Sequence, residues 1–516
     1  MFRLTPSGEQ LPVAVATALP PKPATLDTFG GPVRIEWDIA AAMSPLGQAA
    51  YFIDFLKASG RYAEWVAGCQ LGYTSGNAPK AAEVCGTALL SILSGHSRYA
   101  HITALRSDAI MPDLLGMEKI MSEDAMRRGF TAIAENGGEQ WLQKHIDRDV
   151  EPLLSEPYII DVDTTVKPLY GRQEGAVVSY NPKKRGRPSH VLHTYFMGGT
   201  RLVLGVELAP GNEHTGKHAA PGFWAMIDRR PKDLAPKLVR GDKGIASQSM
   251  MQNCEIRGID FLFKLKMSTN AKKLVATAVT ATDWCDVGQG WQGREGKLRL
   301  VGWSHHRRVV VMRRWRRDEE KPGSLDEDEQ MLLGLAMADA KAGKYEYAIL
   351  VTSLQNELLS IAQLYRERAD CENVFDELKN QWGWGGFTTQ DLARCKISAQ
   401  MVALVYNWWN IFARLAEPDK HMEAITSRPL LLSGIAERLR HARQTTLRVA
   451  SQHGRSGWAR TALERIAGFL RDLTKAAEQL NPAQIWVRIL SEAFRAFLNG
   501  RQLRPPPRLS APLHPA

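Results

Sequence analysis

The chain has 516 residues, of which 44% are hydrophobic and 23% charged, so it is long enough for several domains with buried cores. Its formal net charge of +11 favours a polyanionic partner. The N-terminus lacks the apolar core of a signal peptide, no apolar run is long enough to span a membrane, and the six cysteines form no CxxC pair. These features argue against a membrane protein, a zinc ribbon and a disulfide framework, and they predict a cytoplasmic protein.

The first half of the chain changes from helical to strand periodicity. Residues 1–30 are rich in Pro, Thr and Ala and predict a loose arm, whereas residues 40–150 have apolar residues at helical spacing. Runs in the order β-β-β-α-β-α-β then follow, at residues 157–166, 191–197, 202–208, 214–228, 237–240, 246–257 and 261–265. This order predicts an α/β fold in which an antiparallel hairpin feeds a partly parallel sheet.

Residues 270–345 break this rhythm with β-prone runs, glycines and an acidic loop, and they predict a mainly β insertion closed by a strand at 345–352. Asn356 to Asn380 predicts one long helix, a second follows at 397–415, and helices continue to a Pro-rich tail. From His421 onward there are 14 Arg and 1 Lys against 5 Glu and 1 Asp, a net charge of +9. A solvated helical surface and a surface for nucleic acid or a partner protein both explain this charge.

Three acidic residues lie on or after predicted strands. Asp161 and Asp163 are two apart on one strand, so both point to the same face. Their apolar neighbours indicate a central strand, where like charges need a cation, hydrogen bonds or a raised pKa; alternatively, one of them caps a turn. Asp242 follows the strand at 237–240, at the end where ligand groups gather in open α/β sheets. An ordinary turn beside glycine also explains Asp242.

The predicted helix 356–380 carries a polar stripe, within about 60° of arc at helical geometry, made of Tyr365, Arg368, Glu372 and Lys379. A solvated helix face explains these charges by itself. Glu372 also completes a set of three carboxylates with Asp163 and Asp242. Such oxygen ligands suit two Mg²⁺ or Mn²⁺ ions about 3.5–4 Å apart, which together activate a nucleophile and stabilise a leaving oxygen in phosphodiester cleavage. Arg368 and Lys379 would then contact phosphates beside the metals.

Basic and aromatic segments provide further candidates. NPKKRGRPSH, which resembles a minor-groove AT-hook core or forms an exposed basic turn, holds Lys183, Lys184, Arg185 and Arg187. The run RRVVVMRRWRR at 307–317 predicts a strand that follows a phosphate backbone, or a salt-bridged edge strand facing the acidic loop at 318–328. We interpret Trp382 and Trp384 as packing or helix-stop residues rather than as residues that stack on DNA bases. The pairs His190/His193 and His305/His306 lack companion ligands and predict no metal site.

At the acidic residues the sequence resembles the DDE-type transposases of bacterial insertion sequences, in the subgroup with a β-strand insertion before the last acidic residue. The motifs are Asp163-Thr164-Thr165, Asp242 in RGDKG, and Tyr-x2-Arg-x3-Glu-x6-Lys, which Tyr365, Arg368, Glu372 and Lys379 meet. The loop from Tyr170 to His190 and the segment ALVYNWWN from Ala403 to Asn410 are also similar to the family, so the resemblance covers residues 155–415.

The resemblance implies an RNase H-like mixed sheet flanked by helices and interrupted by a β-rich insertion. The catalytic core would span 151–270 and 346–416, and the insertion 271–345. The helical region 1–150 would bind element-end DNA, and the basic helical region 417–516 would serve DNA binding or dimerisation. The resemblance also implies that Asp163, Asp242 and Glu372 hold Mg²⁺, replaceable by Mn²⁺, as two ions. Asp163 is preferred over Asp161 because it directly precedes Thr-Thr.

The implied reaction is cut-and-paste transposition. Hydrolysis frees a 3′-hydroxyl at the element end, and this hydroxyl attacks target DNA. The implied partners are double-stranded DNA, as terminal inverted repeats and target, and a second copy of the chain in a homodimer. The residues expected to contact DNA are Tyr365, Arg368, Lys379, Lys183, Lys184, Arg185 and Arg187. Members that cut through a DNA hairpin need an aromatic residue; near the closing strand the sequence has Tyr345 and Tyr347 rather than Trp, which leaves a hairpin step open.

Two other functions agree with parts of the sequence, but one feature argues against each. A DNA-binding protein derived from a transposase would keep the basic surfaces without catalysis, but all three carboxylates are intact. A structure-specific nuclease of the same fold would need no strand transfer, but the large terminal regions suit the pairing of two DNA ends better. The sequence therefore favours an active DNA transposase.

Overall fold

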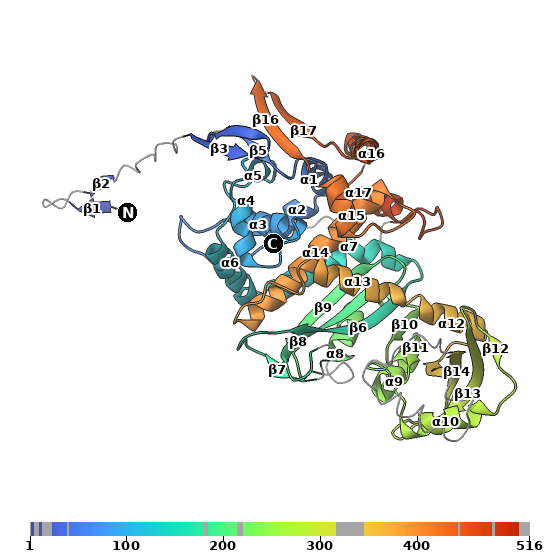
Figure 1. The fold of residues 1–516 in the computed structure, drawn as a ribbon. Coiled ribbons are helices and arrows are strands. Elements are labelled where there is room, and N and C mark those ends of the chain that lie inside the picture. Colours follow the sequence, from blue (N-terminus) through green and yellow to red (C-terminus); the bar gives the residue numbers. More distant parts are fainter. Residues whose placement is uncertain are drawn as a thin grey trace.

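A mixed β-sheet forms the centre of the protein, with helices on both faces (Figure 1). The computed structural model describes residues 2–4, 10–12, 23–38, 41–179, 181, 184–213, 220–315, 345–441, 444–476 and 480–504. The strands of the central sheet are β6 (Ile159–Pro168), β7 (Val177–Val178), β8 (Pro188–Met197), β9 (Leu202–Pro210), β10 (Leu238–Gly241), β11 (Asp260–Lys264), β12 (Cys285–Asp286), β13 (Trp291–Leu298), β14 (Arg307–Trp315) and β15 (Tyr345–Thr352).

The strand order is β12-β13-β14-β15-β11-β10-β6-β8-β7, and β9 also pairs with β8. Strand β10 runs parallel to both β6 and β11, whereas β6, β8 and β9 pair antiparallel. The predicted antiparallel hairpin that feeds a partly parallel sheet is therefore confirmed. Helices α8 (Ala220–Asp228) and α9 (Gln248–Arg257) occupy the predicted positions between these strands.

The predicted β insertion extends this same sheet. Strand β15 pairs antiparallel with β11, and β14 and β13 continue outward from it. Since β14 lies between two strands, the prediction of an edge strand at 307–317 is wrong, and the acidic loop expected to face it lies outside the described residues. The segment also contains an unpredicted helix, α10 (Thr269–Val279), whose first turn is capped by the Ser268 hydroxyl and whose inner face is buried.

Two consecutive helices cross one face of the sheet. Helix α12 (Leu358–Arg366) covers the half containing β10, β11, β14 and β15, while α13 (Ala369–Asn380) covers β6 and β8. The prediction of one helix over 356–380 is wrong, because the chain turns at residues 367–368. This break lies over the boundary between β6 and β10, where the acidic motifs are.

Helix α14 (Leu392–Ala416) is buried along most of its length and packs against β9 (Figure 1). Its Asn407 side chain accepts a hydrogen bond from the Val203 amide at 2.9 Å and donates one to the Val203 carbonyl at 2.8 Å. These bonds satisfy backbone groups of β9, which pairs with β8 alone, so the helix covers this edge of the sheet. The predicted helical N-terminal region contains α1 (Ala49–Ala58), α2 (Arg61–Gly68), α3 (Ala81–Leu93), α4 (Ile102–Leu105), α5 (Met111–Leu114), α6 (Glu123–Glu135) and α7 (Gly138–Val150). Of these, α1, α3, α6 and α7 pack against α14.

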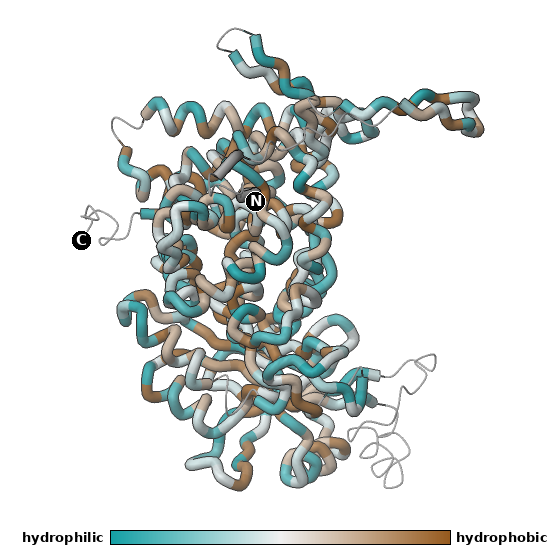
Figure 2. Tube along the Cα trace, turned by 90° about the vertical axis from the view of Figure 1, so that its left-hand side faces the viewer, coloured by the Kyte–Doolittle hydropathy of each residue, from teal (hydrophilic) through white to brown (hydrophobic). Residues whose placement is uncertain are grey.

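The C-terminal region contains α15 (Ala424–Leu431), α16 (Ser456–Lys475) and α17 (Pro482–Ala493). The expectation of helices throughout is wrong, because β16 (Ile435–His441) and β17 (Gln444–Ala450) form a hairpin that projects from the body (Figures 1 and 2). Strand β16 also pairs with β5 (Met43–Ser44).

The predicted loose N-terminal arm is partly ordered into strands. They are β1 (Phe2–Leu4), β2 (Gln10–Pro12), β3 (Ala24–Thr28) and β4 (Gly31–Ile35). The β3–β4 hairpin exposes nearly all of its side chains. Within the described ranges, none of the helices has the length and apolar character that crossing a bilayer requires.

Candidate active site

Strands β6 and β10 bring two of the acidic motifs side by side. Their parallel register pairs Leu238 with Ile159 and Arg240 with Asp161. Because side chains alternate along a strand, Asp163 shares the face of Asp161, and Asp242 shares the face of Arg240. The pairing of the two strands ends at Gly241 and Val162, and Asp242 and Asp163 are the residues that follow this last pair.

Asp163 is held in place by charged and backbone partners. Its side chain is 13% exposed, and its Oδ2 accepts a hydrogen bond from Arg368 Nη1 at 3.1 Å. Its Oδ1 accepts a hydrogen bond from the Thr164 amide at 2.8 Å. Arg368 is the N-cap residue of α13 and stacks over the Tyr365 ring at 5.9 Å. Of the motif residues, Arg368 thus contacts Asp163 directly, and Tyr365 contacts Arg368.

The third acidic residue lies near the same point. Glu372 is exposed in the first turn of α13, where the positive end of the helix favours a carboxylate. Burial raises the pKa of Asp163 to about 7; Arg368 opposes this shift, and the negative charges of Asp242 and Glu372 add to it. Asp242 and Glu372 therefore both lie near enough to Asp163 for their charges to add to the rise in its pKa.

The donor chemistry of these residues fits a divalent cation. In the described ranges, no three His, Cys, Asp or Glu side chains form a ready-made metal cluster. Arg368, rather than a third carboxylate, contacts Asp163. The set nevertheless consists of carboxylate oxygens, the ligands that Mg²⁺ and Mn²⁺ prefer, and their mutual repulsion is what a bound cation would relieve.

Asp161 differs from Asp163 although both lie on the same face of β6. Asp161 is 2% exposed, and its two carboxylate oxygens accept hydrogen bonds from Arg240 Nε and Nη2 at 2.7 and 2.8 Å. Both of its oxygens are therefore engaged by a buried guanidinium. Asp163, in contrast, lies in the middle of β6, just beyond the last residue that pairs with β10, and its side chain is partly exposed.

The four motif residues do not lie on one continuous helix, so the predicted 60° stripe is wrong. Tyr365 lies in the last turn of α12, Arg368 in the break, Glu372 in the first turn of α13 and Lys379 in its last turn. Tyr365 nevertheless remains near the acidic residues. Burial raises its pKa, Arg368 lowers it, and Asp242 and Asp163 add to the rise.

The basic loop before β8 is exposed at the residues described there, Lys184, Arg185 and Arg187, while Lys183 lies outside the described residues. Lys184 Nζ and the Arg187 guanidinium lie 4.9 and 4.6 Å from the Tyr170 ring centre. Tyr170 is 68% exposed. The contact of Tyr170 with these cations was not predicted, although an aromatic residue at the start of the same loop indicates such a contact.

The arginines of β14 have partners within the fold. Arg307 pairs with Glu255, Arg308 with Glu295 and Arg314 with Glu346. Arg313 lies 4.0 Å from the Trp284 ring and 4.7 Å from the Tyr345 ring. These described residues are thus internal contacts of the extended sheet rather than an open row of phosphate ligands.

An aromatic residue near the closing strand was overlooked. The register of β14 and β15 places Trp315 opposite Tyr345, with ring centres 5.0 Å apart. Trp315 is 51% exposed. Because Trp315 belongs to the preceding strand, a search confined to the sequence around residue 345 could not find it.

The remaining aromatic and histidine candidates are structural. Trp382 and Trp384 are buried and donate to Glu377 Oε1 and the Ala399 carbonyl, which confirms their predicted packing role. His190 contacts the Glu174 carbonyl, and His193 contacts the Thr164 hydroxyl.

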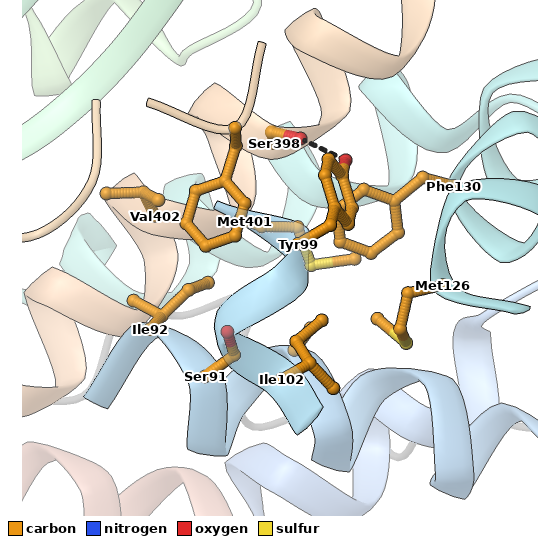
Figure 3. A pocket seen from close by; sticks show the side chains of 11 residues that line it. Ser91, Ile92, Tyr99, Ile102, Met126, Phe130, Ser398, Met401 and Val402 are labelled. Atoms are coloured by element: carbon orange, nitrogen blue, oxygen red, sulfur yellow. Dashed lines mark hydrogen bonds between the residues drawn. The ribbon is translucent and has the colours of Figure 1, made fainter. Parts of the chain in front are cut away.

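A small apolar cavity lies among α3, α6 and α14, away from the acidic residues (Figure 3). Its walls include Ile92, Met126, Phe130 and Met401, and no charged side chain lines it. The hydroxyl groups of Tyr99 and Ser398 form a hydrogen bond of 3.2 Å at its edge. The cavity is therefore a packing feature of the helical layer and has no reactive group.

Comparison with known families now defines the class of the protein. Residues 82–470 match the family model described as transposase DDE domain group 1. This span runs from α3 into α16 and contains all three acidic residues, and the chain belongs to this family of DDE transposases.

Among solved structures, the piggyBac transposase in a synaptic complex with hairpin DNA is similar, with 10% identity and a TM-score of 0.38. The similarity covers 84% of this chain and 82% of that one. No curated protein sequence matches the chain.

Proposed function

We propose that this protein is a metal-dependent DNA transposase that cleaves DNA at the ends of a mobile element and joins the freed 3′-hydroxyl to target DNA. The observation that carries the proposal is the gathering of Asp163, Asp242 and Glu372 from three segments of a DDE-family chain. The order β9-β8-β6-β10-β11, with an antiparallel hairpin beside parallel strands, supports an RNase H-like core.

Asp163, Asp242 and Glu372 would hold Mg²⁺, or Mn²⁺ in its place, as two ions. Bound there, the ions would activate the attacking oxygen and stabilise the leaving oxygen. Burial, with a smaller contribution from Asp242 and Glu372, raises the pKa of Asp163 to about 7, and a bound cation would favour its charged form.

The protein's own cations would position DNA around this centre. Arg368 stands against Asp163, and its fork of donors suits a phosphate beside the acidic residues. Lys379 in the last turn of α13 and Tyr365 complete the expected contacts on these helices. The exposed loop before β8 would bind the backbone of double-stranded DNA through Lys183, Lys184, Arg185 and Arg187. Two copies of the chain would pair the two element ends as a homodimer.

The test compares Asp242→Ala with Asp260→Ala on element-end DNA. Asp260 is exposed at the beginning of β11, so it lies at the opposite end of the parallel pair β10–β11 from Asp242 and is a matched control. We expect Asp242→Ala to lose Mg²⁺-dependent cleavage while both variants still bind the DNA. Cleavage that survives in Asp242→Ala would overturn the assignment of the site.

A further inference from the structure

One buried guanidinium of β10 contacts β6 and the junction between α12 and α13. Arg240 is 1% exposed on β10 and donates from Nε and Nη2 to both oxygens of Asp161 on β6. Its Nη1 donates to the Leu364 carbonyl in α12 and lies 3.5 Å from Glu367 Oε2 in the break before α13. A single planar group thus contacts two strands and the helix junction above them.

Each of the residues Asp161, Arg240 and Glu367 lies close in the sequence to one of the three acidic residues. Asp163 lies two residues after Asp161 on the same face of β6, and Asp242 lies two residues after Arg240, directly beyond the end of β10. Glu372 lies five residues after Glu367, in the first turn of α13. Any rotation or slip of one of these segments that changed the spacing of the acidic residues would therefore also strain the contacts of Arg240.

Arg240 also contributes to the end of α12. In a continuous helix the Arg368 amide would bond to the Leu364 carbonyl. Here that amide bonds to the Tyr365 carbonyl at 3.1 Å, and Arg240 takes the Leu364 carbonyl instead. A cation at the last carbonyls is favourable for a helix C-terminus. The place where α13 begins, and with it the position of Glu372, is thus tied to a residue of β10.

The pair has no spare room around it. A Cβ atom on Gly198, in the turn after β8, would lie 3.1 Å from Arg240 Nη2 and 3.4 Å from Asp161 Oδ2. Stability alone explains such a pair poorly, because buried ion pairs are often replaceable by apolar residues of similar volume. A rigid, directional link between segments is what a planar guanidinium supplies and an apolar residue does not.

We propose that Arg240 is a positioning residue that aligns Asp163, Asp242 and Glu372, and that Asp161 is its fixed partner rather than a metal ligand. This inference rests on the proposed function, since it concerns the same metal-binding carboxylates. Arg240 acts through its neighbours and touches no reacting group.

The test uses Arg240→Lys, which keeps the charge and removes the fork. Arg307→Lys is the matched control, because Arg307 is 3% exposed and donates to both oxygens of Glu255 at 2.7 and 2.9 Å, yet joins β14 to α9. Binding of Mn²⁺ to the full-length protein is measured by electron paramagnetic resonance, and the Mg²⁺ dependence of cleavage and the melting temperature are measured in parallel.

We expect Arg240→Lys to raise the Kd for Mn²⁺ and the Mg²⁺ concentration at half-maximal cleavage by about 10- to 100-fold, the range found when an outer partner of a metal ligand is removed. Excess metal should restore most of the cleavage rate. Arg307→Lys should leave the Kd unchanged even where its melting temperature falls as far. An unchanged Kd in Arg240→Lys, or an equal rise in both variants, would overturn the positioning role.

Asp161→Asn provides a second route if Arg240→Lys does not fold. It should weaken Mn²⁺ binding without changing the number of bound ions, whereas Asp163→Asn should lower that number. Loss of an ion in Asp161→Asn would make Asp161 a ligand and refute the proposal. If Asp242→Ala binds Mn²⁺ as the unchanged protein does, the proposed metal site itself is wrong, and the positioning role is refuted with it.

Discussion

Glu377 anchors the helix that carries Glu372, and its removal should loosen that helix. Its carboxylate is 1% exposed and accepts three hydrogen bonds. The donors are Trp382 Nε1 at 3.1 Å, His421 Nε2 at 2.7 Å and the Ala424 amide at 3.0 Å. We predict that Glu377→Ala destabilises the protein and lowers its cleavage activity, because three segments lose their common acceptor.

The size of the effect follows from the donors left behind. Each buried donor without a partner costs about 1–3 kcal/mol, and three donors lose their acceptor, so the total is at least about 3 kcal/mol. At roughly 2–4 °C per kcal/mol for a large domain, the melting temperature should fall by about 10 °C. Glu377→Gln keeps the shape and one acceptor oxygen, so it should lose much less.

The pH dependence has a definite sign. Burial raises the pKa of Glu377, but the hydrogen bonds from His421, Trp382 and the Ala424 amide outweigh burial and leave the pKa lowered. Its stabilising contribution is therefore complete above the ordinary value of 4.5 and is lost as the pH falls through the lower folded value. Melting curves of Glu377→Ala and the unchanged protein should converge in acid. Equal melting temperatures at neutral pH, or a gap that widens in acid, would refute this reasoning.

Three further predictions concern other regions. Because burial raises the pKa of Asp163 to about 7, a cation competes there with a proton, so titration calorimetry should show Mn²⁺ binding weaken below about pH 7 in the unchanged protein but not in Asp163→Asn. Ser398→Ala leaves the buried Tyr99 hydroxyl without its partner and should cost about 1–3 kcal/mol, which a lower melting temperature would show. Replacing the three described cations of the loop before β8 with alanine should weaken binding to all DNA sequences alike; these cations are Lys184, Arg185 and Arg187. The slope of log K against log salt concentration should become smaller by about 3. An unchanged slope would contradict a role of these residues in phosphate contact.

Much of the sheet was predictable because its signals are local. Alternating apolar residues and turn glycines indicated β6, β8, β9, β10 and β11 within a few residues of their ends. The same local signals placed Asp163 on one strand and Asp242 at the end of another. The hairpin of β16 and β17 was not predictable in this way, because its Glu, Arg, Leu and Ala residues suit a helix and its pairing partner β5 comes from the other end of the chain.

The details of the candidate site depend on contacts between distant segments. Residues 356–380 have the composition of one helix, and the break at 367–368 involves Arg240, which lies more than a hundred residues earlier in the chain. Alternation likewise put Asp161 and Asp163 on one face without distinguishing them. Their contacts with other segments distinguish them, because Arg240 of the neighbouring strand donates to Asp161, whereas Arg368 donates to Asp163.

The extension of the sheet by β12 to β15 has a consequence for incomplete chains. Asp163 and Asp242 belong to strands that pair directly with each other, but Glu372 comes only after the added strands have been synthesised. A polypeptide that is still on the ribosome, or that a protease has cut before α13, holds two of the three acidic residues and lacks the Leu364 contact of Arg240 if it ends before α12. For a DDE transposase, this order of synthesis confines the complete acidic set to chains in which the added strands have already been made.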